Sequence, residues 1–536
     1  MKHPFRSLLS LTLAAACGLQ LAAAAAPEPA AAWAEAAAAA GVQRGLLSSE
    51  ASAYTSNTPI TGTEFLTLLA QLDDSAQAPS VWAAQLGLTI PDGSAAQPLS
   101  RQDAAVLMDA YLTQRAVILP TAAAQPFSDL GAAQSAAQES ISRLQQAGLF
   151  AGKEGNTFQP EAPLTRAEAA VLLDRAWTVL TAVDRSIETI PSFDGYPLAG
   201  KLNVPRREQV DTLVVFVNGS GPNTYDNTRQ IGAEPFNYFD IFAEYCAREG
   251  AAFFSSSTRG VSAGTQPPLF CEIDEAAYQT YQPEAVVQDT EAIVQHLRKD
   301  ARFQNAKIYL LGWSEGTMIA PKVAARGKVQ VDGLLLAGYV NGTMAETLEW
   351  QQTGGSSMVI YCQYFDTDGD GRISAAEYEA DPYQVRTALG LSEIAFSDLD
   401  LDGNGYLERS DLATMLQASR AALYDAIDRG DDAWLASSYS VRLTSAWFHA
   451  HEAFQPNREM LTSLTLPISI FQGECDANVS VQDARDAAAA FESAGKHNLT
   501  LHTFPDADHD LNISAYFYGA PLPDGFRTLF RTIGGK

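Results

Sequence analysis

The sequence has little positive charge, few cysteines and no long apolar run beyond its start. Its 536 residues contain 35 Lys and Arg against 63 Asp and Glu, a formal net charge of −28. Nucleic-acid binding needs clustered cations, so this balance argues against such a partner. After residue 30 no segment reaches the roughly 18 uninterrupted apolar residues of a membrane helix. A hydrophobic content of 46% excludes a mostly disordered polymer, and the length allows about three domains.

The first 26 residues have the pattern of an export signal. Lys2 and Arg6 precede a short apolar stretch, which a run of small residues follows. The apolar stretch is too short to span a bilayer stably. We therefore predict a signal peptide over residues 1–26 and a secreted protein without a transmembrane helix. Lipidation at Cys17 is an alternative that the sequence leaves open.

Four cysteines remain after the signal: Cys246, Cys271, Cys362 and Cys475. Outside the cytoplasm an even number permits two disulfides, with three possible pairings. Pairing Cys246 with Cys271 and Cys362 with Cys475 would link neighbouring parts of the fold predicted below. Buried free thiols are the alternative.

Residues 27–181 are rich in alanine and contain three copies of one unit, at about 27–75, 76–120 and 125–180. The copies align on the segments PITGTEFLTLLAQL, PLSRQDAAVLMDAYL and PLTRAEAAVLLDRAW. Each segment places Thr or Ser at the start of an amphipathic run, the pattern of an N-cap followed by a helix. A Gly-containing turn precedes each segment. Three copies of a helix, a turn and a capped helix predict units that pack against one another.

The third copy resembles the S-layer homology family, and its matching residues are Gly148, Gly152, Phe158, Pro160, Thr165, Arg166, Ala167 and Glu168. The resemblance implies non-covalent attachment to secondary cell-wall polysaccharide, which often carries an acidic pyruvyl group. A guanidinium can bind a carboxylate through two hydrogen bonds. We therefore predict Trp33, Arg101 and Arg166 as wall-polymer-binding residues. Surface ion pairing of the two arginines is the alternative, and the first copy has Gly62 where the arginine belongs.

After residue 183 short runs rich in Val, Ile, Leu and Phe alternate with helical stretches. The runs are TLVVFVNGSG, GAAFFSSST, AKIYLLGWSEG, VDGLLLAGYVNG and LPISIFQGE. Strands that alternate with helices predict a parallel sheet whose strands are buried. The class predicted for this part is α/β.

A nucleophile, a base and an acid occur in this part in a fixed order. Ser314 lies in Gly-Trp-Ser-Glu-Gly, between a predicted strand and a predicted helix, where two glycines allow a tight turn. A serine hydroxyl needs a base, and His509, in a polar loop after the strand-like NLTLHTF, is the best placed of the seven histidines. Asp476 follows a strand and is the predicted acid, with Glu474 as the alternative.

The order Ser314, Asp476, His509 resembles that of the α/β-hydrolase family. The resemblance implies a hydrolase domain formed by residues 186–340 and 461–536, with an acyl-enzyme mechanism. The segment VNGSGPN, at 217–223, fits the oxyanion loop, although the family commonly has His where this chain has Asn218. We predict the backbone N–H groups of Glu315 and Ser220 as oxyanion donors, with Gly221 as the neighbouring alternative to Ser220.

A cap insertion over residues 341–460 contains two acidic loops, at 366–377 and 400–411. Both resemble the EF-hand calcium loop, which takes oxygen ligands at fixed positions and a glycine at its sharp turn. The predicted ligands are Asp366, Asp368, Asp370, the Arg372 carbonyl and Glu377 in the first loop, and Asp400, Asp402, Asn404, the Tyr406 carbonyl and Asp411 in the second. We predict one or two structural Ca²⁺ ions that stabilise the cap, while a solvated acidic loop is the alternative.

These patterns together predict a cell-wall-anchored serine hydrolase that cleaves carboxylic esters. The expected fold is an α/β-hydrolase domain with a parallel-rich sheet and an α-helical cap insertion that contains the EF-hand pair. Helical S-layer homology repeats precede it. A peptidase or amidase of the same fold and a non-catalytic surface-binding protein are the alternatives.

Overall fold

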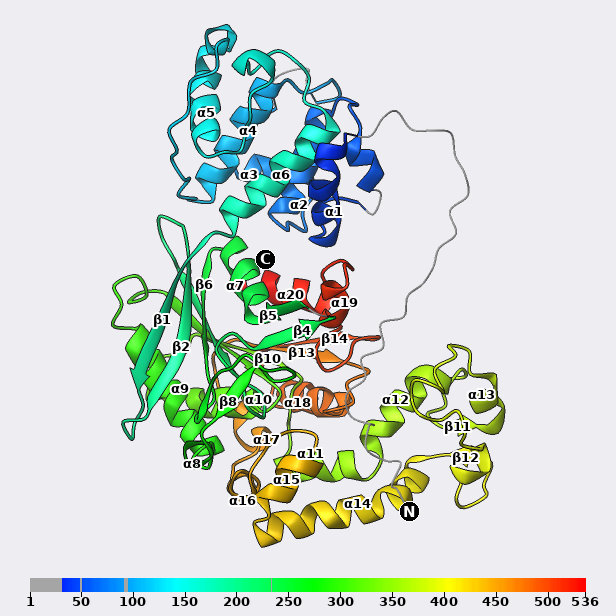
Figure 1. Cartoon of the computed structure of the whole chain (residues 1–536). Coiled ribbons are helices and arrows are strands. Elements are labelled where there is room, and N and C mark those ends of the chain that lie inside the picture. The colour runs from blue at the N-terminus through cyan, green and yellow to red at the C-terminus, as the bar shows by residue number, and fades with distance from the viewer. Residues whose placement is uncertain (1–30, 49–50, 91–94, 233) are drawn as a thin grey trace.

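The computed structural model of the chain describes residues 31–48, 51–90, 95–232 and 234–536. The predicted signal peptide and Cys17 lie outside the described residues. The chain forms a helical N-terminal unit, a central sheet flanked by helices, and a helical cap that extends into an arm (Figure 1). No helix in the described ranges is both long and apolar enough to cross a membrane.

The N-terminal unit is a bundle of short helices, and α2, α4 and α6 begin where the three sequence segments predict. Its α-helices are α1 Glu35–Gln43, α2 Gly62–Leu72, α3 Pro79–Gln85, α4 Arg101–Gln114, α5 Ser135–Gln146 and α6 Arg166–Leu180. The side chains of Thr61, Ser100 and Thr165 accept hydrogen bonds from backbone N–H groups in the first turns of α2, α4 and α6. These side chains satisfy donors that the start of a helix leaves without partners.

The three copies are joined in a cycle by short β-bridges. Each copy pairs the residues just before its capped helix with those of the next copy: Pro59 with Thr165, Thr61 with Pro98, and Ser100 with Pro163. The cycle extends to the side chains, because Arg101 of the second copy binds Glu168 of the third, and Arg166 of the third copy binds Glu64 of the first. Each copy therefore buries its apolar face against the other two.

The structure corrects the prediction that Arg101 binds wall polymer. Its side chain is buried, Nη1 donates to Glu168 at 2.8 Å and Nε donates to the Phe158 carbonyl at 2.8 Å. This guanidinium stabilises the contact between repeats and is not accessible to a polysaccharide. Arg166 is partly exposed and pairs with Glu64, whereas Trp33 is 59% exposed.

An eight-stranded sheet forms the centre of the molecule, in the order β1-β2-β6-β3-β9-β10-β13-β14. Its strands are β1 Val183–Pro191, β2 Pro197–Pro205, β3 Thr212–Val217, β6 Ala251–Ser256, β9 Lys307–Trp313, β10 Gly333–Ala337, β13 Ile468–Gly473 and β14 Leu499–Phe504. Neighbours from β6 to β14 are parallel, while β2 is antiparallel to both β1 and β6. The parallel strands coincide with the apolar runs of the sequence, and the predicted α/β class is confirmed.

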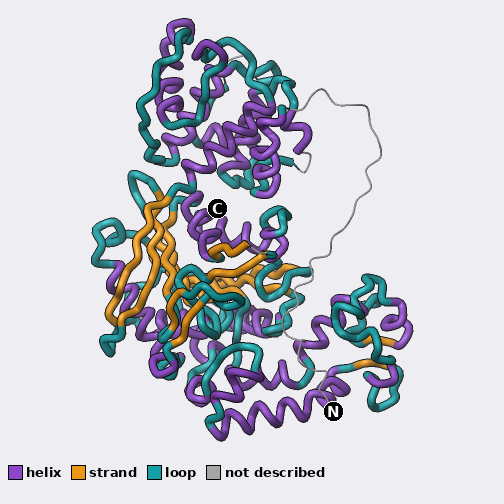
Figure 2. The backbone as a smooth tube through the Cα atoms, in the orientation of Figure 1, coloured by secondary structure: helices purple, strands orange, loops and turns teal. Residues whose placement is uncertain are grey.

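The two faces of the sheet belong to two different cores. Val214 and Phe216 of β3 point into one core, and Val215 and Val217 point into the other, as the two-residue period of a strand requires. The first core includes residues of α7 (Phe239–Arg248) and α20 (Asp524–Ile533); the second includes α9 (Pro283–Leu297), α10 (Gly316–Arg326) and α18 (Val481–Ser493). Figure 2 shows the strands between these helices.

Short elements connect the strands and line the edge of the sheet. They are β4 Thr228–Ile231, β5 Glu234–Asn237, β7 Val261–Ala263, β8 Cys271–Ile273, α8 Glu275–Tyr278 and α19 Ile513–Phe517. The hairpins β4–β5 and β7–β8 are antiparallel and separate from the main sheet.

The cap follows β10 and returns to the sheet at β13. Its elements are α11 Met344–Gln352, α12 Gly355–Phe365, β11 Ile373–Ser374, α13 Ala375–Ala380, β12 Tyr406–Leu407, α14 Arg409–Arg429, α15 Asp432–Ser438, α16 Ser445–Glu452 and α17 Asn457–Met460. The arm from α12 to the start of α14 has a small core of its own, which includes Phe365, Ile373 and Leu407. The long helix α14 connects this arm to the part of the cap that packs on the core of the sheet domain (Figure 1).

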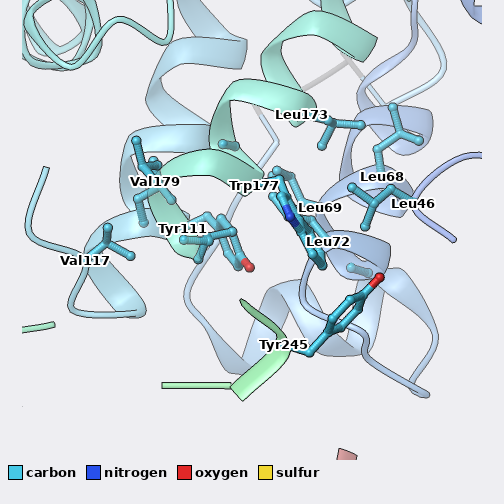
Figure 3. Close-up of a cluster of buried hydrophobic side chains, with 14 of the residues drawn as sticks. Leu46, Leu68, Leu69, Leu72, Tyr111, Val117, Leu173, Trp177, Val179 and Tyr245 are labelled. Carbon is cyan, nitrogen blue, oxygen red and sulfur yellow. The ribbon is translucent and has the colours of Figure 1, made fainter. Parts of the chain in front are cut away.

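The N-terminal unit packs directly on α7 and α20 of the sheet domain. Trp177, on α6, lies with its ring centroid 5.1 Å from that of Tyr245 on α7 (Figure 3). Tyr245 in turn stacks on Phe530 of α20 at 5.0 Å. One continuous apolar cluster spans both units. At its rim Asp74 pairs with Arg248 at 2.9 Å and with Arg531 at 2.8 Å.

The four cysteines are free thiols in the structure, and three of them, Cys271, Cys362 and Cys475, are only partly buried. Cys246 is buried on α7 within the apolar core, and burial raises the pKa of its thiol.

Candidate active site

Ser314 stands on a sharp turn between β9 and α10. Its φ of +55° is in the left-handed region, which costs a residue with a side chain about 1–2 kcal/mol. The glycines on either side permit the turn: a β-carbon on Gly312 would lie 2.3 Å from the Gly316 carbonyl oxygen, and one on Gly316 would lie 2.1 Å from the Val217 carbonyl oxygen. The Ser314 N–H donates to the Ala337 carbonyl at 2.9 Å, which ties the turn to the end of β10.

His509 and Asp476 form a hydrogen-bonded pair at the same edge of the sheet. The loops after β14 and β13 carry them, and His509 Nδ1 lies 2.9 Å from Asp476 Oδ2. Asp476 is buried, and its other oxygen accepts hydrogen bonds from the backbone N–H groups of Asn478 and Val479 at 2.8 and 2.9 Å. The alternative acid, Glu474, pairs with Arg485 at 3.2 Å. The geometry therefore favours Asp476 as the partner of the imidazole.

The environment of His509 favours its protonated form. Burial lowers the pKa of this imidazole, but the Asp476 carboxylate, with Asp510 and Asp508 nearby, outweighs burial and raises the pKa of His509 to about 9. Proton transfer from a serine would create an imidazolium in this position, and the buried carboxylate stabilises that positive charge.

The His509 ring and Ser314 lie near the ends of neighbouring strands. The ring packs on the backbone of Gly338, so closely that a β-carbon there would lie 2.6 Å from His509 Cε1. Gly338 follows Ala337, whose carbonyl binds the Ser314 N–H. Among the described residues no hydrogen bond joins Ser314 to His509; in hydrolases without substrate such a bond is often long.

The loop at 217–223 lies against Ser314. A β-carbon on Gly219 would lie 3.1 Å from Ser314 Cβ. The Gly221 N–H donates to the Tyr281 hydroxyl at 3.3 Å, whereas the N–H groups of Ser220 and Glu315 have no partner among the described residues. Asn218 binds the Ser256 carbonyl at 2.7 Å and so anchors the loop to β6. Of the neighbouring Ser220 and Gly221 N–H groups of the loop, only that of Gly221 has a partner among the described residues.

The two acidic loops lie side by side at the tip of the arm. Ile373 pairs with Leu407 and Ser374 with Tyr406 in a short antiparallel ladder between the loops. The carboxylates gather in two groups whose ligand oxygens lie within 4.8 Å of one another: Asp366 with Asp368 and Asp370, and Asp400 with Asp402 and Asp411. An all-oxygen carboxylate set suits a hard cation such as Ca²⁺.

The closing ligands of the two loops are held in the same way. Glu377 accepts from the Thr367 and Ser374 N–H groups at 2.8 and 2.9 Å, and Asp411 accepts from the Leu401 and Glu408 N–H groups, both at 2.9 Å. Burial opposes the ionisation of Glu377, but the backbone donors lower its pKa to about 2. Glu377 is therefore ionised, while the carboxylates that gather in its loop are those of Asp366, Asp368 and Asp370. Arg372, Asn404 and Tyr406 occupy the remaining predicted positions on the same two loops.

Comparison with known proteins identifies parts of the chain. A model of the S-layer homology domain matches residues 126–170, and an EF-hand model matches residues 363–380. The chain is 29% identical over 155 residues to Esterase EstD of Thermotoga maritima. That alignment covers 29% of this chain and 33% of the relative, so the chain spans about a third of the length of the curated protein that it matches.

The sheet order, with β2 antiparallel and the serine turn after the central strand β9, is that of the α/β-hydrolase fold. The chain has the α/β-hydrolase fold, and two of its segments match the S-layer homology domain and the EF hand. Solved structures similar to the chain include an esterase from Exiguobacterium antarcticum, with 16% identity, a TM-score of 0.33 and coverage of 65% of this chain and 99% of the other. A carboxyl esterase from Bacillus coagulans is 12% identical, with a TM-score of 0.37 and coverage of 66% and 100%.

Sequence reasoning missed the residues around the Glu315 side chain. This carboxylate accepts hydrogen bonds from Trp447 of α16 and from Tyr281, which precedes α9, and it contacts His451 of α16. His451 lies in an amphipathic run of the sequence, and 136 positions separate it from Glu315. No spacing pattern connects residues that far apart.

Proposed function

We propose that the chain is a serine esterase held at the cell surface, with Ser314 as nucleophile, His509 as base and Asp476 as the acid that orients the base. The observation that carries this proposal is the 2.9 Å contact between Asp476 and His509, which stands beside the Ser314 turn at the carboxyl edge of the sheet. The relation to Esterase EstD supports ester substrates.

In the proposed reaction, His509 Nε2 takes the proton of Ser314 as Oγ attacks the ester carbonyl. The N–H groups of Glu315 and Ser220 hold the oxyanion, and each such donor contributes about 3 kcal/mol to the stabilisation of the transition state. His509 then gives the proton to the leaving alcohol. Water, activated by the same imidazole, hydrolyses the acyl-enzyme.

Calcium and cell-wall polymer are the proposed partners outside the catalytic centre. The two carboxylate groups of the arm would each hold one Ca²⁺, which would neutralise clustered charge and fix the start of α14. The N-terminal repeats would bind secondary cell-wall polysaccharide, a role that the S-layer homology match supports. Exposed Trp33 and partly exposed Arg166 remain available for that contact.

Activity-based labelling tests the catalytic proposal. We expect a fluorophosphonate to label the wild-type protein, and Ser314→Ala to abolish labelling and reduce ester turnover by roughly 10⁴-fold or more. p-Nitrophenyl acyl esters of increasing chain length should be cleaved faster than aminoacyl p-nitroanilides. Faster cleavage of the anilides would indicate a peptidase, and the absence of both labelling and turnover would indicate a binding protein.

A further inference from the structure

The side chain of Glu315 is a buried carboxylate immediately after the nucleophile. Only 1% of Glu315 is exposed, and its oxygens accept hydrogen bonds from Trp447 Nε1 at 3.0 Å and from the Tyr281 hydroxyl, and contact His451 Nε2 at 2.9 Å. Burying a carboxylate is costly unless several donors compensate for the lost water. These donors come from the cap helix α16 and from the segment between α8 and α9.

His451 directs Nε2 at Glu315 from inside the cluster. It is 1% exposed, its ring lies 4.2 Å from that of Trp447, and its Nδ1 has no hydrogen-bond partner among the described residues. A buried N–H without a partner costs more than an unpaired lone pair. A hydrogen on Nε2 points toward Glu315 and lets the ring donate to this carboxylate.

Tyr281 extends the cluster to the oxyanion loop. Its hydroxyl donates to Glu315 and accepts from the Gly221 N–H at 3.3 Å. This bond turns the Gly221 N–H toward Tyr281 and leaves the neighbouring Ser220 N–H available. The cap touches the same place, because a β-carbon on Gly221 would lie 3.0 Å from Val441 Cγ1.

We propose that Glu315 and Tyr281 are positioning residues, whose side chains couple the seating of the cap to the geometry of the oxyanion hole. The inference rests on the proposed esterase function and assigns the Glu315 side chain a role separate from that of its backbone N–H. The carboxylate holds α16, and through Tyr281 it sets the orientation of the loop that carries Ser220. Displacing an oxyanion donor by about 1 Å lowers the reaction rate roughly 100-fold. The loss of one hydrogen bond between Glu315, Tyr281 and Gly221 is therefore expected to change the kinetics measurably.

Tyr281→Phe tests the coupling, with Tyr278→Phe as a matched control. The Tyr278 ring lies 5.5 Å from that of Tyr281, is fully buried, and its hydroxyl donates to the Arg442 carbonyl of the cap at 2.7 Å. Each variant loses one buried hydroxyl that bonds outside its own segment, but only Tyr281 touches Glu315 and Gly221.

With a short p-nitrophenyl ester we expect Tyr281→Phe to lower kcat by about 10- to 100-fold with less than about 3-fold change in KM. The affinity for an alkyl boronic acid, which forms a tetrahedral adduct with the serine, should fall by the same factor as kcat/KM. Tyr278→Phe should stay within about 3-fold of the wild type in both measurements. Equal effects of the two variants, or none in either, would overturn the proposal.

Amide hydrogen exchange gives a readout that does not depend on turnover. We expect exchange at Gly221 to accelerate in Tyr281→Phe and to remain at the wild-type rate in Tyr278→Phe. Unchanged protection at Gly221 in Tyr281→Phe would contradict the coupling even in an active enzyme. A wild-type protein that neither labels at Ser314 nor cleaves esters would instead refute the proposed function, and the exchange comparison would still decide whether Tyr281 orders the loop.

Discussion

The contact between Gly338 and His509 allows a sharp test of the catalytic geometry. The backbone of Gly338 has φ +62°, and a β-carbon there would lie 2.6 Å from His509 Cε1 and 2.9 Å from Nδ1. Ordinary contact begins at 3.4 Å, so Gly338→Ala must displace the ring by about 0.8 Å, the difference between 3.4 and 2.6 Å. Because Nδ1 is bound to Asp476, this movement disturbs the hydrogen bond that orients the imidazole.

A misplacement of this size is expected to reduce kcat/KM for a p-nitrophenyl ester by roughly 100-fold. The substitution also strains the backbone, because alanine in the left-handed region costs about 1–2 kcal/mol. Gly327→Ala separates the two effects. Gly327 has φ +61° at the end of α10, and no atom lies within 4 Å of the position that its β-carbon would take.

Both variants should therefore lose about 1–2 kcal/mol in the free energy of unfolding from the backbone alone, measured by denaturant titration. Only Gly338→Ala should lose activity in the folded protein. If Gly338→Ala cleaves esters as fast as Gly327→Ala, the His509 ring does not act from the position seen here, and the assignment of the base is wrong.

Three further predictions concern charge. Since the pKa of His509 is raised to about 9, kcat/KM should rise with pH between 7 and 9 as the ring loses its proton. In Asp476→Asn this rise should move to lower pH, while the maximum of kcat/KM falls about 10⁴-fold. If the rise stays at the same pH, His509 is not the titrating group. Removal of Ca²⁺ by a chelator should lower the thermal midpoint and the ester turnover, because α14 joins the acidic loops to the cap. If neither the midpoint nor the turnover changes, the proposal that Ca²⁺ stabilises the cap is wrong. Asp74→Ala should lower the free energy of unfolding by about 3 kcal/mol or more, since it leaves buried Arg248 without this partner. Asp425→Ala, which breaks an exposed pair with Arg429 at 3.0 Å, should lower it by under about 0.5 kcal/mol. Equal losses would refute the role of the buried pair.

The parallel part of the fold could be predicted because its signals are local. A buried parallel strand must be apolar on both faces, so β3, β6, β9, β10 and β13 stand out as continuous runs. The Ser314 turn has an equally local cause in its two flanking glycines. The antiparallel strand β1 gives no such signal, because most of its residues are exposed and no run of apolar side chains marks it.

The errors and omissions concern burial and contacts between distant segments. Arg101 has the sequence context of a ligand-binding arginine, but the cycle of repeats places Glu168 and the Phe158 carbonyl at its guanidinium and removes it from solvent. The Glu315 cluster depends on the return of the cap over the nucleophile, which no motif encodes. The pairing of His509 with Asp476 was easier to anticipate, since parallel strands bring their carboxyl ends to one edge.

The contact between the N-terminal unit and the sheet domain has a consequence for wall attachment. Only two residues separate α6 from β1, and Trp177 is buried against Tyr245, so the repeats cannot swing freely relative to the catalytic edge. The repeats pack on the side of α7 and α20, whereas the cap lies on the opposite side of the sheet domain (Figure 1). A chain bound to the wall through its repeats should therefore keep its cap turned toward the medium. We expect the full-length protein to hydrolyse a soluble ester at the same rate when bound to isolated cell walls as when free in solution. A large loss of turnover on binding would show that the wall covers the active site, and that the repeats bind polymer through a surface next to the cap.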